Sequence, residues 1–284
     1  MRGRSIDPQH AERTADRLWK SAVEQAAERI ERSPGLLRDL AYEAQAVIGY
    51  RSVGDPSASR QITREAFVLA DEAYSALFAV ALAPEGSVVR SPVRGPRTMA
   101  GGTIIRGFAS VEAWLDALWF SVILRDDESL RRLCTITENR LRETGGLTVD
   151  PYVFTWVRAL QGYFANSPDA LDLLYAAMEA TDPETLKVSP EHALLISYPA
   201  MKLLYFLALQ EPDGFNEALE EAVDLHDHFW SSEPDLLENP YGFTAGGPLA
   251  LACAAHDLGM PVTVGSPYLP RSIVSGAAFG RTSV

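Results

Sequence analysis

Two of the five histidines in this 284-residue chain lie close enough together in the sequence to suggest a metal site. His226 and His228 both lie in the segment "LHDHFW", within a predicted helix. Side chains two positions apart on a helix point about 200° away from each other, so these imidazoles cannot bind one metal ion without unwinding the helix. The spacing of an HExxH zinc motif is absent. We therefore predict no metal site, with His226 in the core and His228 in solvent.

Two other motifs have simpler structural interpretations than catalytic ones. The pair Asp126-Asp127 in "RDDESLRRL" is similar to aspartate-rich magnesium motifs, but Leu130 stands where a further carboxylate is needed. A helix N-cap followed by a first-turn acid explains the same residues. The glycines of "TAGGPLAL" precede a helix, yet Pro248 lacks an amide and no Lys-Ser/Thr pair follows as in a P-loop. We predict no catalytic residues and no cofactor.

Charge is distributed very unevenly along the chain. The net charge is −13, and residues 1–142 carry 20 basic and 19 acidic side chains, whereas residues 143–284 carry 5 and 19. No Lys or Arg lies between Lys202 and Arg271, although Glu211 to Glu238 contains ten carboxylates. Counterion release favours nucleic-acid binding by basic surfaces, so this charge argues against a nucleic-acid partner.

The densest acidic cluster belongs to a predicted helix at 213–231. Its apolar face includes Phe215, Leu219 and Phe229 at helical spacing. Carboxylates recur every three or four residues on the other side, at Glu217, Glu220, Glu221, Asp224 and Asp227. Like charges at this spacing destabilise a helix by a few tenths of a kcal/mol per pair, and the helix has no cation of its own. The cluster is therefore either a surface that binds a basic partner or a solvated face that serves solubility.

Helices must position these residues, because nearly every long segment has apolar residues at helical spacing. Proline after a capping residue or glycine predicts helix starts at Pro8, Pro34, Pro151, Pro168, Pro190 and Pro248. Residues 190–209 are apolar nearly all round, which predicts a central helix interrupted or kinked at Pro199. We expect an all-α fold built as an array of packed helical pairs.

Two regions break the helical pattern. Residues 84–109 combine prolines, glycines and short β-branched runs at Val88-Val89 and Ile104-Ile105, which predicts a small β excursion near 86–106. After Gly259, "MPVTVGSPYLP" predicts a short strand near 261–265, and the tail beyond Ser272 is expected to fray. We predict one domain over 1–284, with N-terminal helices at 7–83, an excursion at 84–109, a helical core at 110–258 and a C-terminal strand, turn and tail at 259–284.

The composition is typical of a globular protein, with 47% hydrophobic and 22% charged residues. The N-terminal segment lacks the apolar stretch of a signal peptide, and we expect no apolar run near the ~18 residues that span a membrane. Cys134 and Cys253 lie among apolar residues without CxxC spacing, which favours reduced, buried thiols. We therefore expect a cytoplasmic protein with no membrane partner.

Three segments in the second half of the chain carry a family resemblance. In chain order they are "HALLISYPAMKLL", "FNEALEEAVDLHDHFW" and "GGPLALACAAHDLGMPVTVGSPYLPRSIV". Together they resemble the immunity protein 49 family of bacterial polymorphic toxin systems. The third segment is the most specific, because it combines an alanine-rich helix, a glycine stop, V-x-V and an "SPYLP" turn. The resemblance covers residues 105–274.

This resemblance implies a mostly helical protein that protects a bacterium by binding a cognate protein toxin, with no catalytic residues to assign. The acidic half would suit a toxin with a basic surface. Two alternatives remain open from the residues alone. One is a helical enzyme whose dispersed carboxylates assemble in the fold, and the other is a helical scaffold that binds a protein without inhibiting it.

Overall fold

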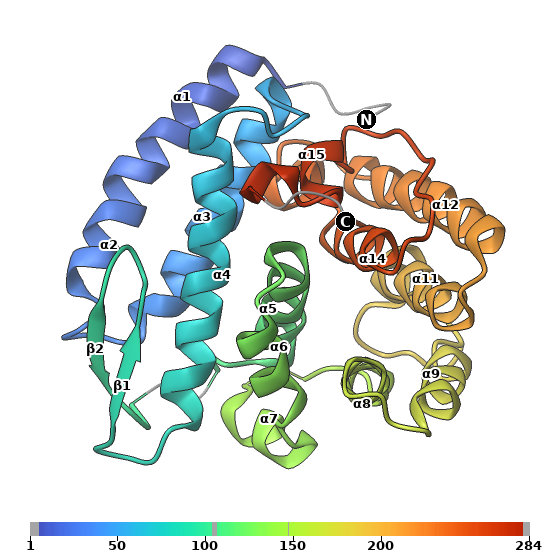
Figure 1. Ribbon diagram of the computed structural model, residues 1–284, viewed down its shortest axis with the longest axis horizontal. Coiled ribbons are helices and arrows are strands. Elements are labelled where there is room, and N and C mark those ends of the chain that lie inside the picture. Colours follow the sequence, from blue (N-terminus) through green and yellow to red (C-terminus); the bar gives the residue numbers. More distant parts are fainter. Residues whose placement is uncertain (1–5, 104–106, 147, 281–284) are drawn as a thin grey trace.

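The computed structural model describes residues 6–103, 107–146 and 148–280, and its regular structure is almost entirely helical (Figure 1). The main helices are α1 (Pro8–Leu18), α2 (Glu24–Arg29), α3 (Leu36–Gly54), α4 (Gln61–Leu82), α5 (Val111–Leu124), α6 (Asp127–Cys134), α7 (Glu138–Thr144), α8 (Tyr152–Phe164), α9 (Ala170–Glu179), α11 (Tyr198–Leu209), α12 (Pro212–Ser231) and α14 (Gly246–Asp257). Shorter elements are η1 (Trp19–Val23), α10 (Pro190–His192), η2 (Ala193–Ser197), α13 (Pro234–Leu237), η3 (Pro240–Phe243), α15 (Arg271–Val274) and η4 (Ala277–Phe279). The predicted all-α class is confirmed.

Consecutive helices pack as pairs, as the sequence predicts. Contacts join α3 to α4, α8 to α9 and α11 to α12. Helix α5 packs against both α4 and α14, so it connects the N-terminal helices to the C-terminal ones (Figure 1). One cluster of buried apolar residues extends from Ala15 to Val274. The removal of this apolar surface from water is the main stabilising contribution to the fold.

The proline signals locate helix starts to within about two residues. Asp7 caps α1 by accepting hydrogen bonds from the amides of Gln9 and His10, with Pro8 as the first helical residue. Asp150 is different, because its carboxylate accepts from the amides of Lys187 and Val188, 2.9 and 3.0 Å away. The proline at 151 predicts that Asp150 caps the following helix, and this prediction is wrong, since Asp150 binds a distant loop instead.

The central apolar helix is interrupted, as predicted. The π-helical turn η2 lies between α10 and α11, directly before the buried Pro199 near the start of α11. Together α10, η2 and α11 form one helical span, Pro190–Leu209, which is long and apolar enough to cross a membrane, contrary to the expectation that no such segment exists. The core helices of globular proteins meet the same criterion, and this one packs against α9, α12 and α14.

The excursion after α4 contains a β-hairpin. Strands β1 (Val88–Ser91) and β2 (Arg97–Ala100) pair antiparallel, with Val88 opposite Ala100. The turn between them has Arg94 and Gly95 at φ +48° and +103°, a left-handed pair that suits hairpin connections. The predicted excursion is confirmed, but the second strand is Arg97–Ala100, and Ile104-Ile105 lie outside the described residues.

The predicted strand at 261–265 is wrong. These residues are all described and form no strand, because the side chain of Asn216 stands where a neighbouring strand would be. The Asn216 carboxamide donates to Pro261 O at 2.8 Å and accepts from the amide of Thr263 at 2.8 Å. A side-chain amide thereby satisfies the extended backbone of this segment.

The expected fraying beyond residue 272 is also wrong for the described residues. Helix α15 buries Ile273 and Val274, and Arg125 donates to both of their carbonyl oxygens, at 2.9 and 2.6 Å. The same guanidinium forms an ion pair with Asp257 at 2.9 Å. Arg125 therefore holds the end of the chain against α5 and α14.

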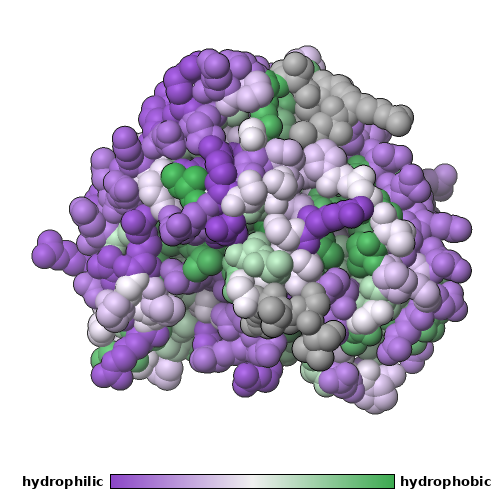
Figure 2. Space-filling view, turned by 45° about the horizontal axis from the view of Figure 1, so that its top comes forward, coloured by the Kyte–Doolittle hydropathy of each residue, from purple (hydrophilic) through white to green (hydrophobic). Residues whose placement is uncertain are grey.

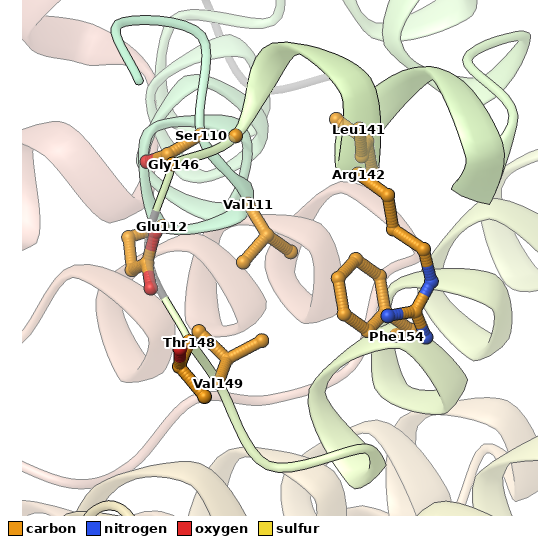
Figure 3. Close-up of a pocket in the computed structure, with 10 residues that line it drawn as sticks. Ser110, Val111, Glu112, Leu141, Arg142, Gly146, Thr148, Val149 and Phe154 are labelled. Atoms are coloured by element: carbon orange, nitrogen blue, oxygen red, sulfur yellow. The ribbon is translucent and has the colours of Figure 1, made fainter. Parts of the chain in front are cut away.

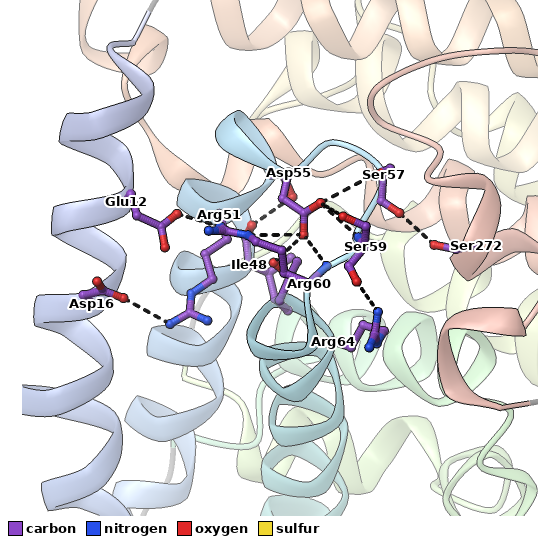
Figure 4. A network of polar contacts seen from close by, with 12 residues as sticks. Glu12, Asp16, Ile48, Arg51, Asp55, Ser57, Ser59, Arg60, Arg64 and Ser272 are labelled. Atoms are coloured by element: carbon purple, nitrogen blue, oxygen red, sulfur yellow. Dashed lines mark hydrogen bonds and ion pairs between the residues drawn. The ribbon is translucent and has the colours of Figure 1, made fainter.

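A second polar network joins the N-terminal helices to α15 (Figure 4). Between α3 and α4, Asp55 accepts from the amides of Ser59 and Arg60 and from the hydroxyls of Ser59 and Thr63. Burial alone would raise the pKa of Asp55, but these hydrogen bonds lower it to about 2. Beside them, Ser272 Oγ donates to Ser57 O at 2.7 Å. The α3–α4 connection is thereby fixed to the C-terminal segment.

Gly49 provides a stability test of the contact between α3 and η3. A Cβ atom at Gly49 would lie 1.9 Å from the backbone oxygen of Pro240, whereas one at Gly54 would meet nothing within 4 Å. Alanine gains about 1 kcal/mol of helix propensity over glycine, but a backbone clash costs about 1–3 kcal/mol or more. We expect Gly49→Ala to lower the free energy of unfolding in urea titrations and Gly54→Ala to leave it unchanged or higher. Equal stabilities would contradict this packing.

Candidate functional site

Helix α12 positions the five carboxylates that helical spacing places on one face, between residues 217 and 227. Its inner face buries Phe215, Leu219, Val223 and His226 against the core. Contacts with α11, α14 and η2 fix the rotation of the helix about its axis. The opposite face is therefore turned to solvent, where Glu217, Glu220, Glu221 and Asp224 are exposed and Asp227 is half-buried.

The carboxylates do not stand on an open helix surface. Four of them line one wall of a groove of about 530 Å³, whose other wall is the segment Thr263–Tyr268. The four are Glu217, Glu220, Asp224 and Asp227. The groove holds its shape at both ends, because Asn216 bonds to Thr263 and Tyr268 Oη donates to Asp227 Oδ1 at 2.5 Å. We call it the acidic groove.

Glu221 lies apart from this groove. Its carboxylate pairs with Lys202 Nζ of α11 at 2.5 Å and does not line the groove. The helix itself contains no cation, but its neighbour α11 supplies one to this edge. The structure therefore brings four of the five predicted residues together and assigns the fifth to an ion pair with α11.

The acidic groove concentrates negative charge with little compensation. Among the described residues that line it there is no Lys or Arg. Carboxylates at i, i+3 and i, i+4 repel one another, so a basic group placed between them would relieve this repulsion. Hydrophilic residues cover most of the right-hand edge of the face in Figure 2, the side on which α12 lies in Figure 1. The groove is suited to a cationic surface.

The sequence matches the immunity protein 49 family over residues 55–273. The chain belongs to this family. The match begins well before the segments that carry the resemblance in the sequence, and it includes both walls of the acidic groove. No curated protein and no solved structure matches the chain.

The histidines of this immunity protein 49 family member have the predicted placement. His226 is buried, with Nε2 3.1 Å from Gly242 O and its ring edge-on to Tyr268 at 4.9 Å, whereas His228 is exposed. Within the described residues no three His, Cys, Asp or Glu side chains gather as a metal site would require. His226 therefore helps to hold Tyr268 beside the acidic groove.

The remaining motifs of the family member also have structural roles. Asp126 caps α6 by accepting from the amides of Glu128 and Ser129, which confirms the N-cap interpretation. Cys253 is fully buried and Cys134 half-buried, and both are free thiols. Burial raises the pKa of Cys253 to about 12 and that of Cys134 to about 11, so neither forms a thiolate nucleophile at neutral pH.

Among the other hollows, two lie beside α5, and neither is predicted from the sequence. One, of about 300 Å³, lies beside the start of α5 (Figure 3). Its cation, Arg142, already lies over the Phe154 ring at 3.7 Å and donates to Glu138. The other, of about 360 Å³, is lined by aromatic residues from separate helices. Helical periodicity gives no signal for it, because its lining comes from segments that are distant in the sequence.

Proposed function

We propose that this immunity protein 49 family member binds a cognate protein toxin in the bacterial cytoplasm and neutralises it by occupying it, without catalysis. Membership of the family carries the proposal. The acidic groove supports a more specific form of it, in which the toxin presents a basic surface to Glu217, Glu220, Asp224 and Asp227. Complementary charge would speed the encounter and fix the orientation of the two proteins.

A toxin that acts on nucleic acid would carry such a basic surface, because phosphate contacts dominate nucleic-acid affinity. An acidic inhibitor that covers this surface blocks the toxin without needing to contact its catalytic residues. The mechanism is therefore steric and electrostatic. It requires one inhibitor site for each toxin molecule, and it predicts that neutralisation depends on the ratio of the two proteins.

The test is a titration of a candidate toxin, the product of a gene next to this one, with the purified chain. We expect residual toxin activity to fall in proportion to added chain and to reach zero at a fixed molar ratio. Co-expression should likewise restore growth to cells that produce the toxin. Full toxin activity in the presence of excess chain would contradict the proposal. Complete neutralisation by a small fraction of the toxin's molar amount would instead indicate catalysis.

A further inference from the structure

The aromatic hollow of about 360 Å³ is a second candidate site, which shares α12 with the acidic groove but is lined by different residues of that helix, His226 and Trp230. Its lining comes from α3, α5, α8, α10, η2, α11, α12, η3 and α14. Its aromatic residues are Tyr42, Trp119, Trp156, Trp230 and Tyr241. Trp156 and Trp119 are almost completely buried, whereas His192 is exposed at the rim. A hollow of this size, lined mainly by apolar surface together with some polar side chains, is typical of small-molecule sites. We call it the aromatic pocket.

The rings of the aromatic pocket are arranged in pairs. Trp119 and Trp156 lie with centroids 6.3 Å apart and ring planes tilted by 44°. Tyr42 and Tyr241 form a second pair, edge-on at 6.3 Å. The faces of aromatic rings carry negative electrostatic potential and attract cations. The Tyr42 ring already has one such contact, since the guanidinium of Arg38 lies 4.9 Å from its centroid.

Two carboxylates from one side of α5 line the same pocket. Asp116 Oδ2 accepts a hydrogen bond from Tyr74 Oη at 3.0 Å. Glu112, one turn earlier, has its Oε2 atom buried without a hydrogen-bond partner among the described residues. A buried carboxylate oxygen that lacks a donor is destabilising, so a cation placed against it would compensate this cost. Glu112 stands between the aromatic pocket and the hollow of about 300 Å³ and lines both.

The charge of the pocket is not balanced by its own lining. No Lys or Arg is among the described residues that line it. Burial raises the pKa of Asp116 to about 6, against the lowering effect of hydrogen bonds from Tyr74 and Gln45. A cation bound beside Asp116 would favour its ionised form, whereas an anionic ligand would be repelled by it. A metal ion is disfavoured as well, because the described residues bring no three of its usual ligands together.

We propose that the aromatic pocket binds a small organic cation with an alkylated ammonium group. The ammonium would lie against Asp116 and Glu112, and its alkyl groups would contact the faces of Trp119 and Trp156. Aromatic rings combined with a carboxylate are the chemistry by which proteins recognise quaternary ammonium groups. This inference does not depend on the acidic groove or on toxin binding.

The test uses choline as the probe and 3,3-dimethyl-1-butanol, its uncharged analogue of the same shape, as the comparison. Binding is followed by calorimetry and by the fluorescence of the pocket tryptophans. We expect saturable choline binding and at least tenfold weaker binding of the neutral analogue. No saturable binding of choline at millimolar concentrations would overturn the proposal. Equal affinity for the two probes would also overturn it, because the pocket would then be only an apolar hollow.

Asp116→Asn should weaken choline binding about tenfold or more and leave the binding of the neutral analogue unchanged. Glu112→Gln is the second variant, in case loss of the Asp116 charge disturbs the hydrogen bond from Tyr74 and the fold. Asp172→Asn, at an exposed position of α9, removes the same charge away from the pocket and should bind choline as the wild type does. Thermal melts establish that each variant is folded. Unchanged choline affinity in folded Asp116→Asn and Glu112→Gln would overturn the assignment.

Discussion

Replacing Glu217, Glu220 and Asp224 by lysine is expected to slow association with the toxin by about 10- to 100-fold at low salt. These side chains are exposed and line the same groove, so their reversal changes the field that a basic surface meets. Charges at the rim of an interface act mainly on the association rate. Added salt should lower the association rate of the wild type more than that of the variant. Salt screens the attraction between the groove and the toxin, and the variant has already lost this attraction. Stopped-flow or surface-based kinetics across a salt series measures both effects.

The matched control reverses three exposed carboxylates elsewhere, Asp172, Glu179 and Glu184, on α9 and just after it. This control changes the net charge by the same amount. It therefore distinguishes the effect of the local charge in the groove from the effect of the total charge of the protein. Glu221 is left unchanged in both variants, since it pairs with Lys202. Surface substitutions usually shift stability by under about 0.5 kcal/mol each, so both variants should fold. Equal association rates for the two variants would mean that the groove is only a solvated surface.

Asp71→Asn is expected to stabilise the protein at neutral pH and to have a much smaller effect near pH 4. Asp71 lies buried in α4, and burial, reinforced by the charge of Asp126, raises the pKa of its carboxyl from 3.8 to about 7. Ser121 Oγ lies 3.3 Å from Asp71 and 2.8 Å from Ala117 O, and its single hydrogen cannot serve both acceptors fully. A protonated Asp71 can donate to this hydroxyl, as an asparagine amide can.

The raised pKa of Asp71 determines the pH range over which this carboxyl changes the stability of the protein. Below the unfolded pKa the carboxyl is neutral in both states, and its contribution to stability is fully present. As pH rises towards 7 only the unfolded chain ionises, which costs the folded state up to about 4 kcal/mol at about 1.4 kcal/mol per pKa unit. Urea titrations between pH 4 and 8 should therefore show the gain of Asp71→Asn growing with pH. If the increase in the free energy of unfolding did not vary with pH, Asp71 would be ionised in the folded protein. Asp172→Asn, at an exposed position, is the control.

Local sequence patterns predict most of the helices and the carboxylates on one wall of the acidic groove, but not the groove itself or its other wall. Helical spacing orders Phe215, Leu219 and the carboxylates onto opposite faces of α12, and the structure confirms this division. The spacing depends only on the geometry of one helix, so no knowledge of its neighbours is needed. Glu221 departs from the group because Lys202, which belongs to another helix, lies beside it.

What the sequence does not predict depends on contacts between distant residues. Asp150 binds the amides of Lys187 and Val188, although a proline follows it as at a helix start. The side chain of Asn216 makes the hydrogen bonds to Pro261 O and Thr263 N that a neighbouring strand would otherwise make, although these residues are far apart in the sequence. The aromatic pocket is assembled in the same way, since its tryptophans each fit the apolar pattern of their own helix. Tertiary contacts decide such features, and single-sequence periodicity carries no information about them.

The most direct test of the central claim is hydrogen exchange of the chain alone and in complex with its toxin. The segment 261–268 has little regular structure, so most of its amides should exchange quickly in the free protein, except that of Thr263, which is hydrogen-bonded to Asn216. If the toxin docks in the acidic groove, exchange should slow in this segment and along α12, and it should change little in β1 and β2. Protection confined to other elements, with 261–268 and α12 unchanged in a saturated complex, would contradict the account.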